Sequence, residues 1–201
     1  MSPPRSRSMV SVARAHVAAS GASLESRLVY ADVLTERGDP RGLFITAQCS
    51  GNEDAARSLL VRYRKHFLYP LSSSADVEFK NGFVDTWTTT PDEFRSAGRK
   101  LLRMTPLRRL IIHNARQCDV QYVINATGFE HVRILELINP IVGALSWLAM
   151  HEGLPGLRTL GVIGTWMPEE RQALLDSKLR STLETLEFTR NPPLPRGPRL
   201  G

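Results

Sequence analysis

Four short segments in the second half of the chain share one pattern of apolar and polar positions. Each reads apolar-x-x-apolar-x-apolar, and they begin at residues 107, 132, 157 and 183, so the intervals are 25, 25 and 26 residues. Alternation of apolar and polar residues is typical of a β-strand that buries one face. The pattern therefore predicts strands at residues 107–112, 132–137, 157–162 and 183–188.

These intervals fall within the roughly 20 to 29 residues of a leucine-rich repeat. One unit has too little surface to cover its own inward-facing apolar residues, so neighbouring units must stack. Parallel strands also need a crossover connection, which is usually a helix. The pattern predicts an α/β fold: a leucine-rich-repeat type solenoid, with a short parallel sheet and helices on its convex side.

Helix signals occupy the stretches between these strands. Thr90, followed by Pro91 and Glu93, supplies an N-cap, a first-turn proline and a capping-box glutamate. Asp119 is expected to cap the next helix, with Gly128 just past the end of that helix. We expect further helices around residues 145–149 and from Pro168, and an atypical first strand at Phe79–Trp87.

Three helices are expected ahead of the repeats. Ser23, Asp39 and Asn52 are of the residue types that cap helix amino termini, and Gly38 suits the end of the first helix. These helices define a small helical module at residues 21–75, followed by the repeat array at residues 76–191. Both ends of the chain are rich in Pro and Arg, so we expect a flexible basic segment at residues 1–20 and a disordered tail at residues 192–201.

Residues 27–48 read RLVYADVLTERGDPRGLFITAQ. This segment resembles the signature of the bacterial repeat-companion domain, which runs close to YADWLEERGDPRGEFIRLQ. It departs from the signature at Val33, where the family usually has Trp, and at Thr35, Leu43, Thr46 and Ala47. The resemblance implies a small helical module followed by leucine-rich repeats, over roughly residues 20 to 190. It implies an architecture rather than an activity, and it carries over no catalytic residue.

The composition is that of an ordinary globular protein, with 42% hydrophobic and 23% charged residues in 201. Charges interrupt every apolar stretch well before the roughly 20 residues that a membrane-spanning helix needs. Arg14 and His16 break the apolar run that a secretory signal requires. We therefore expect a cytoplasmic protein that does not enter a membrane.

The net charge of +6 favours anionic partners through long-range attraction. A basic cluster of Arg62, Arg64, Lys65 and His66 lies among aromatic residues, as in a patch that binds nucleic acid. The cluster also lies at a predicted helix C-terminus, where cations interact favourably with the helix dipole. We favour the helix-dipole interpretation and keep nucleic acid as the alternative partner.

Residues with a chemical role are scarce in this sequence. Cys49 and Cys118 lack the paired spacing of a zinc site, and the five histidines are scattered without a metal-binding motif. The chain has no GxSxG turn, Walker loop or GxGxxG turn. We therefore predict no metal, no cofactor, no catalytic residues and no enzymatic activity.

The residues between the inward-facing apolar positions should point to the concave sheet surface, the usual binding face of such arrays. Several of them are isoleucines, which predicts an exposed apolar stripe with a charged rim, as in an interface core. Two alternatives are that β-branched residues simply suit strands, or that the helical module covers this face. The predicted partner-binding residues are Arg109, Ile111, His113, Ile134, Glu136, Ile138, Thr159, Ile163, Thr185 and Glu187.

The sequence thus favours a non-catalytic protein–protein interaction scaffold that binds a protein partner on its concave face. One alternative is binding of an anionic polymer such as nucleic acid through basic patches. The other alternative is a non-catalytic subunit of an enzyme complex. The sequence identifies no individual partner.

Overall fold

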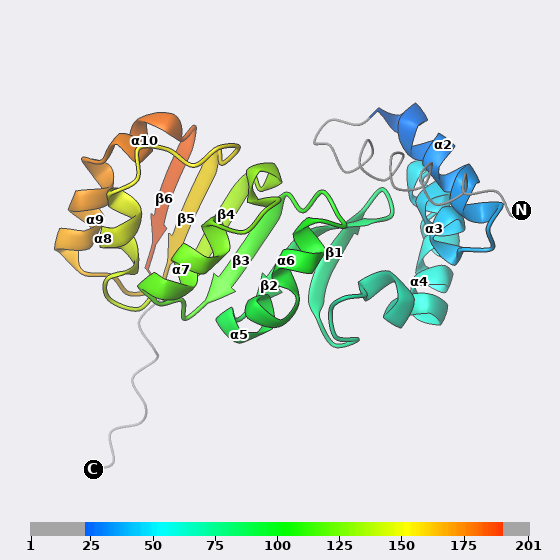
Figure 1. Ribbon diagram of the computed structural model, residues 1–201, viewed down its shortest axis with the longest axis horizontal. Helices are drawn as coiled ribbons and strands as arrows, with labels where there is room; N and C mark the ends of the chain where they lie inside the picture. The colour runs from blue at the N-terminus through cyan, green and yellow to red at the C-terminus, as the bar shows by residue number, and fades with distance from the viewer. Residues whose placement is uncertain (1–22, 191–201) are drawn as a thin grey trace, which may run out of the picture.

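The computed structural model describes residues 23–190, so the predicted flexible segment at 1–20 and the predicted tail at 192–201 lie outside the described residues. A six-stranded sheet runs in the order β1-β2-β3-β4-β5-β6, and a group of three helices lies beyond its β1 edge (Figure 1). β1 (Asp76–Lys80) and β2 (Phe83–Thr89) are antiparallel, whereas all later neighbours pair in parallel. The fold is α/β with a mostly parallel sheet.

The four repeated segments form parallel strands in equivalent registers. They are β3 (Arg109–His113), β4 (Ile134–Ile138), β5 (Thr159–Ile163) and β6 (Thr185–Thr189). The fourth position of every repeat is aligned across the sheet, because Leu110 pairs with Leu135, Leu135 with Leu160, and Leu160 with Leu186. The predicted strands are confirmed.

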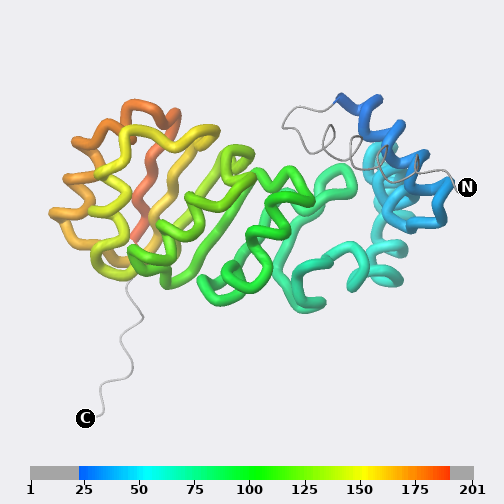
Figure 2. The backbone as a smooth tube through the Cα atoms, in the orientation of Figure 1, coloured from blue at the N-terminus to red at the C-terminus, as the bar shows by residue number. Residues whose placement is uncertain are grey.

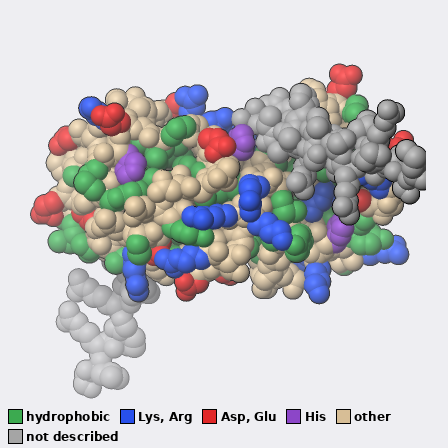
Figure 3. All heavy atoms as spheres, viewed as in Figure 1, with side chains coloured by type: hydrophobic (Ala, Val, Ile, Leu, Met, Phe, Trp, Pro, Cys, Tyr) green, Lys and Arg blue, Asp and Glu red, His purple; other side chains and the backbone are tan. Residues whose placement is uncertain are grey.

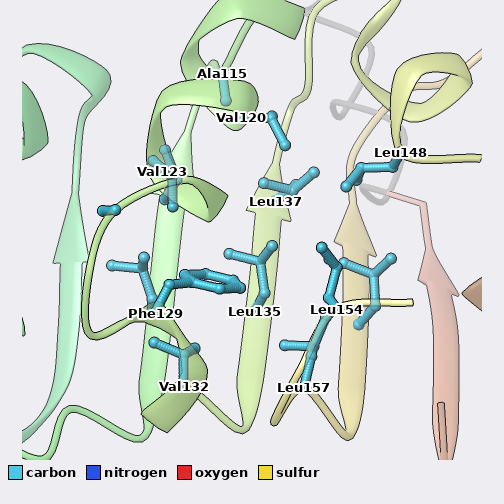
Figure 4. Packing of buried hydrophobic residues seen from close by; sticks show 14 of the residues in the cluster. Ala115, Val120, Val123, Phe129, Val132, Leu135, Leu137, Leu148, Leu154 and Leu157 are labelled. Carbon is cyan, nitrogen blue, oxygen red and sulfur yellow. The ribbon is translucent and has the colours of Figure 1, made fainter. Parts of the chain in front are cut away.

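The inward-facing side chains of β3, β4 and β5 form the centre of one hydrophobic core. Leu135 and Leu137 of β4 are fully buried, and they share this core with Phe129 and Leu148 from the neighbouring helical segments (Figure 4). Burying a leucine side chain contributes about 1.5–3 kcal/mol. Six inward-facing side chains of these three strands are at most 1% exposed, namely Leu110, Ile112, Leu135, Leu137, Leu160 and Val162.

The helices that follow β2, β3, β4 and β5 cover this buried face of the sheet (Figure 1). After β2, the chain forms one continuous helix that contains a π-helical stretch, and Thr90 and Glu93 make the expected capping box at its start. Pro168 begins a later helix, as expected. The helices are α5 (Pro91–Glu93), η1 (Phe94–Gly98), α6 (Arg99–Leu102), α7 (Gln117–Ile124), η2 (Phe129–His131), α8 (Ala144–Ala149), α9 (Pro168–Leu175) and α10 (Lys178–Thr182).

The prediction that Asp119 is the N-cap of α7 is wrong. The N-cap is Arg116, and Asp119 lies at the third helical position, where its Oδ2 accepts the Arg116 backbone N–H at 2.9 Å. The carboxylate therefore caps the helix from inside the first turn. Gly128 does not directly follow α7, because the helix ends at Ile124 with Asn125 as its C-cap. Gly128, with φ +99°, instead introduces η2.

The predicted first strand at Phe79–Trp87 is confirmed only in its second part, Phe83–Trp87, which belongs to β2. The predicted stretch also contains the turn of a β-hairpin, with Asn81 at φ +50° and Gly82 at φ +83° between β1 and β2. Asn-Gly is favoured in such two-residue turns because both positions need positive φ. β2 is the first strand of the parallel array, since its Trp87 pairs with Leu110.

The helical segment ahead of the sheet consists of α2 (Leu24–Thr35), α3 (Pro40–Cys49) and α4 (Glu53–Leu68). The predicted N-caps are confirmed, because the Ser23, Asp39 and Asn52 side chains each accept a backbone N–H from the first turn. Gly38 has φ +71° in the turn between α2 and α3, as its position predicted. Local sequence therefore determines where these helices begin.

Contacts with the hairpin hold these three helices against the edge of the sheet. Gln48 of α3 accepts the Gly82 backbone N–H at 2.6 Å, and the Tyr30 ring stacks on Phe83 with centroids 6.1 Å apart. Arg41 donates to the Gly82 carbonyl at 3.2 Å and to the Phe67 carbonyl at 2.8 Å. One arginine of the signature-like segment thus links α3, the end of α4 and the hairpin turn.

Candidate functional site

The sheet face opposite α5–α10 carries every residue that the sequence predicted for partner binding. We call this surface the open face. Its side chains are partly or fully exposed except for Gly161, which is buried. In β3 to β6 it consists of Arg109, Ile111, His113, Ile134, Glu136, Ile138, Thr159, Gly161, Ile163, Thr185, Glu187 and Thr189.

The helical module does not cover the open face within the described residues. α2, α3 and α4 lie beyond β1, at the far end of the molecule from β6 (Figures 1 and 2). Their buried side chains pack on Phe79 and Phe83 of the hairpin rather than on side chains of β3 to β6. The open face is therefore accessible along the parallel strands of the described chain.

Four isoleucines give the open face its apolar character. Ile138 and Ile163 are direct neighbours on β4 and β5. Ile111 and Ile134 lie on adjacent strands two residues out of register, because Ile111 pairs with Glu136 and Ile134 pairs with Arg109. Diagonal neighbours on one sheet face are about 7–8 Å apart, within reach of larger side chains. The four side chains thus surround Glu136 rather than forming one straight line.

An ion pair lies among these isoleucines. Arg109 donates to Glu136 Oε1 at 2.7 Å, and the two side chains are 41% and 16% exposed. The Arg109 Nε is buried and has no hydrogen-bond partner among the described residues. This pair satisfies one oxygen of the Glu136 carboxylate at the centre of the open face and links β3 to β4.

Glycine at position 161 determines how Glu136 lies on the sheet. A Cβ atom at Gly161 would be 3.0 Å from Glu136 Cγ, which is closer than ordinary van der Waals contact. The Glu136 side chain therefore extends over the β5 backbone at Gly161. Glu187 is the β6 partner of Gly161, so no β5 side chain separates the two glutamates.

Acidic residues continue the open face onto the hairpin. Asp76 pairs with Thr88, the β2 neighbour of Ile111, and Glu78 pairs with Thr86, the β2 neighbour of Arg109. Val77 and Phe79, which alternate with these acids, pack against the hydrophobic core. Asp76 and Glu78 are exposed, and neither pairs with another described residue. Within residues 23–190 the open face therefore has unpaired acids at its β1 end and an ion pair in its centre.

The opposite face, which we call the helix face, carries a basic stripe that the sequence analysis did not single out. Arg95, Arg99, Lys100 and Arg103 are exposed along the helix that runs from α5 to α6, and Figure 3 shows Lys and Arg side chains gathered near the middle of this face. Arg99 lies over the Tyr122 ring, 4.2 Å from its centroid. The helical spacing of about four residues could have identified this stripe.

Arg95 differs from the rest of the stripe because two carboxylates pair with it. It donates to Asp92 at 3.0 Å and forms a second ion pair with Asp119. The nearby Asp119 carboxylate raises the pKa of the Arg95 guanidinium. The unpaired charge of the stripe therefore resides on Arg99, Lys100 and Arg103.

A cleft of about 270 Å³ lies where the helical module meets β2 and α6. Asp39 Oδ1, on its wall, accepts the Arg41 backbone N–H and contacts His66 Nε2, each at 2.9 Å. Burial lowers the pKa of the Arg41 guanidinium, and the Asp39 charge opposes this effect. These polar groups satisfy one another, which makes the cleft a structural junction between the module and the sheet.

The predicted basic cluster near the end of α4 has local structural roles. Arg64 Nε donates to the Ser73 carbonyl at 3.0 Å, and its Nη2 donates to the Ala75 carbonyl at 3.1 Å. Arg62 lies over the Tyr63 ring, 5.2 Å from its centroid. Arg64 therefore ties α4 to the loop that leads into β1.

The described residues contain no group of three or more His, Cys, Asp or Glu side chains placed to hold a metal ion. None of the helices in residues 23–190 has the length and apolar character needed to cross a membrane. No protein-family model, no curated protein and no solved structure matches the chain.

Proposed function

We propose that this chain is a leucine-rich-repeat type solenoid with a repeat-companion module at its amino-terminal side, and that it is a non-catalytic scaffold that binds a protein partner on the open face. The nearly constant interval between strands and their equivalent registers support the repeat assignment. The signature-like segment at residues 27–48 supports the module assignment. Stacked repeats present an extended sheet surface, which such arrays commonly use to bind other proteins.

One observation carries the proposed function: the open face places partly exposed isoleucines around a single ion pair. Ile111, Ile134 and Ile138 lie next to the Arg109–Glu136 pair, and no described helix packs on them. Apolar side chains grouped within a polar rim are typical of protein-binding surfaces. A partner that covers this group would remove apolar surface from water and contribute binding free energy at about 25 cal/mol per Å² before the costs of association.

Site-specific crosslinking tests this function directly. A photoreactive phenylalanine derivative replaces Ile163 or Thr185 on the open face, and in a matched control it replaces Gln172, which is exposed on α9. After irradiation in the cells that make the protein, we expect both open-face positions to crosslink to the same polypeptide. The polypeptide is then identified by mass spectrometry, purified and titrated against the wild-type chain.

The control position decides between a specific and an adventitious contact. The proposal predicts that Gln172 does not crosslink to the identified polypeptide and that the purified pair forms a complex in solution. Crosslinks that arise equally from α9, or that join the open face only to nucleic acid, would contradict it.

The basic stripe favours anionic polymers as a second candidate partner. Arg99, Lys100 and Arg103 are exposed on the helix face, away from the exposed acids of the open face. Neutralising phosphates releases counterions, so the affinity for nucleic acid should fall steeply with salt. The test compares retention of wild type and Arg99→Glu on single-stranded RNA between low and physiological salt. Retention that does not change with salt or with this substitution would eliminate this candidate.

A further inference from the structure

We propose that the open face binds a segment of its protein partner that carries a lysine or arginine flanked by aliphatic side chains. The cationic group lies on the solvent side of the Glu136 and Glu187 carboxylates, and the aliphatic groups lie on Ile138 and Ile163. This inference rests on the proposed function and specifies the chemistry of the partner.

The residues at the middle position of β4, β5 and β6 provide the site for the cation. Glu136, Gly161 and Glu187 are aligned on β4, β5 and β6. Neighbouring strands are about 4.8 Å apart, so the two glutamate backbones are separated by roughly twice that distance. Glu136 extends over Gly161, and because Gly161 has no side chain, no β5 side chain separates a cation on the solvent side of Glu136 from Glu187.

Only one of the four carboxylate oxygens of these two glutamates has a partner among the described residues. Glu136 Oε1 accepts from Arg109, whereas no described residue pairs with Glu136 Oε2 or with Glu187. Glu187 is exposed, and it lies on the outermost described strand. An ammonium or guanidinium group at this position would interact with both carboxylates, which favours a cationic side chain over a neutral or anionic one.

Residues aligned across the strands on either side of Glu136 and Glu187 determine which groups of the partner can flank the cation. Ile138 and Ile163 are direct neighbours on one side, and Thr159 and Thr185 are direct neighbours on the other. The isoleucine pair can cover aliphatic groups, whereas the threonine pair offers hydroxyl groups and small methyl groups. A segment that combines a basic residue with aliphatic neighbours therefore matches the negative charge of the two glutamates and the apolar surface of the isoleucine pair.

The same charges disfavour nucleic acid on the open face. Asp76, Glu78 and Glu187 are exposed acids on this surface, and Arg109 is already paired with Glu136. Phosphate groups placed here would be repelled, although the chain as a whole has a net charge of +6. The open face therefore selects a basic protein segment even though the overall charge attracts polyanions.

Selection from a display library of random twelve-residue peptides on the purified full-length chain tests the inference. We expect the enriched peptides to contain Lys or Arg next to Ile, Val or Leu. The affinity of synthetic copies is then measured for wild type, for Glu187→Lys and for Glu169→Lys. Glu169 is exposed on α9, so it undergoes the same charge change away from the open face.

Reversal of the Glu187 charge should weaken binding of these peptides about five- to tenfold, whereas reversal of Glu169 should leave it unchanged. Thermal unfolding of both variants verifies that the fold is retained. Acidic enriched peptides, no enriched peptides, or equal affinity for wild type and Glu187→Lys would overturn the inference. A dimer of the chain that dissociates on Ile163→Arg would also overturn it, because the open face would then bind a second copy.

The outcomes separate this inference from the proposed function. If a polypeptide crosslinks to Ile163 and Thr185 but its binding segment lacks a basic residue, the interaction function stands and the cation site does not. If basic peptides bind at Glu187 but no polypeptide crosslinks in cells, the chemistry of the face stands and the scaffold function does not.

Discussion

Arg109 and Glu136 are partners across two adjacent strands, joined by a 2.7 Å contact at the centre of the open face. The pair is partly exposed, so solvent screens it and we expect a small contribution to stability, about 0.2–1 kcal/mol. A double-mutant cycle with Arg109→Met and Glu136→Gln measures this coupling by chemical unfolding. The matched control is the more exposed Lys178–Glu152 pair, which should show weaker coupling. Equal coupling in both pairs would contradict this account.

Adjacent residues of β4 should respond differently to truncation, because they point to opposite faces of the sheet. Leu135 is fully buried, so Leu135→Ala should cost about 2–5 kcal/mol of unfolding free energy. Ile134 is partly exposed on the open face, so Ile134→Ala should cost less than about 1 kcal/mol. Urea titration of both variants measures the difference. Equal losses would show that the assignment of the two faces is wrong.

The hairpin turn should tolerate no side chain at Gly82. An added Cβ would lie 2.9 Å from the Ile45 Cα, at a position with φ +83°. We expect Gly82→Ala to cost about 1–3 kcal/mol beyond the conformational cost of positive φ. Gly51→Ala is the control, because Gly51 has φ +72° but no atom within 4 Å of the added Cβ. If thermal denaturation gave the same loss for both variants, the hairpin would not be fixed against α3.

The capping box at the start of α5 should respond to pH. The Thr90 backbone N–H donates to the Glu93 carboxylate and lowers the pKa of Glu93 below its ordinary value of 4.5. A lowered folded-state pKa means that the stabilisation is present above pH 4.5 and is lost as pH falls through the folded-state value. The stability difference between wild type and Glu93→Gln should therefore shrink below pH 4.5. A difference that stays constant down to pH 3 would exclude this role of the carboxylate.

Local patterns in the sequence predicted much of the fold. The repeated alternation identified β3 to β6 and the buried face, because burial on one side of a strand requires this pattern. The caps at Ser23, Asp39 and Asn52 were predictable because each side chain bonds to its own helix. The hairpin was missed because Phe79–Trp87 was interpreted as one strand, although Asn81-Gly82 is a hairpin signal.

The remaining features depend on contacts between distant parts of the chain. The Gln48–Gly82 hydrogen bond that positions the helical module joins residues 34 apart, and neither residue type predicts the other. The ten predicted open-face residues do lie on one surface, since alternation determines which way each side chain points. The extension of Glu136 over Gly161 could not be predicted, because the alignment of the repeats places these residues side by side but does not determine where the glutamate side chain lies.

The most direct test of the central claim is the affinity of the crosslinked partner for an open-face variant, measured by titration calorimetry. Ile138→Arg places a charge among the four isoleucines, and Gln172→Arg places the same charge on the exposed surface of α9. We expect Ile138→Arg to weaken binding about thirtyfold or more while thermal unfolding is unchanged, and Gln172→Arg to bind like wild type. Wild-type affinity in a folded Ile138→Arg variant would show that the partner does not bind the open face.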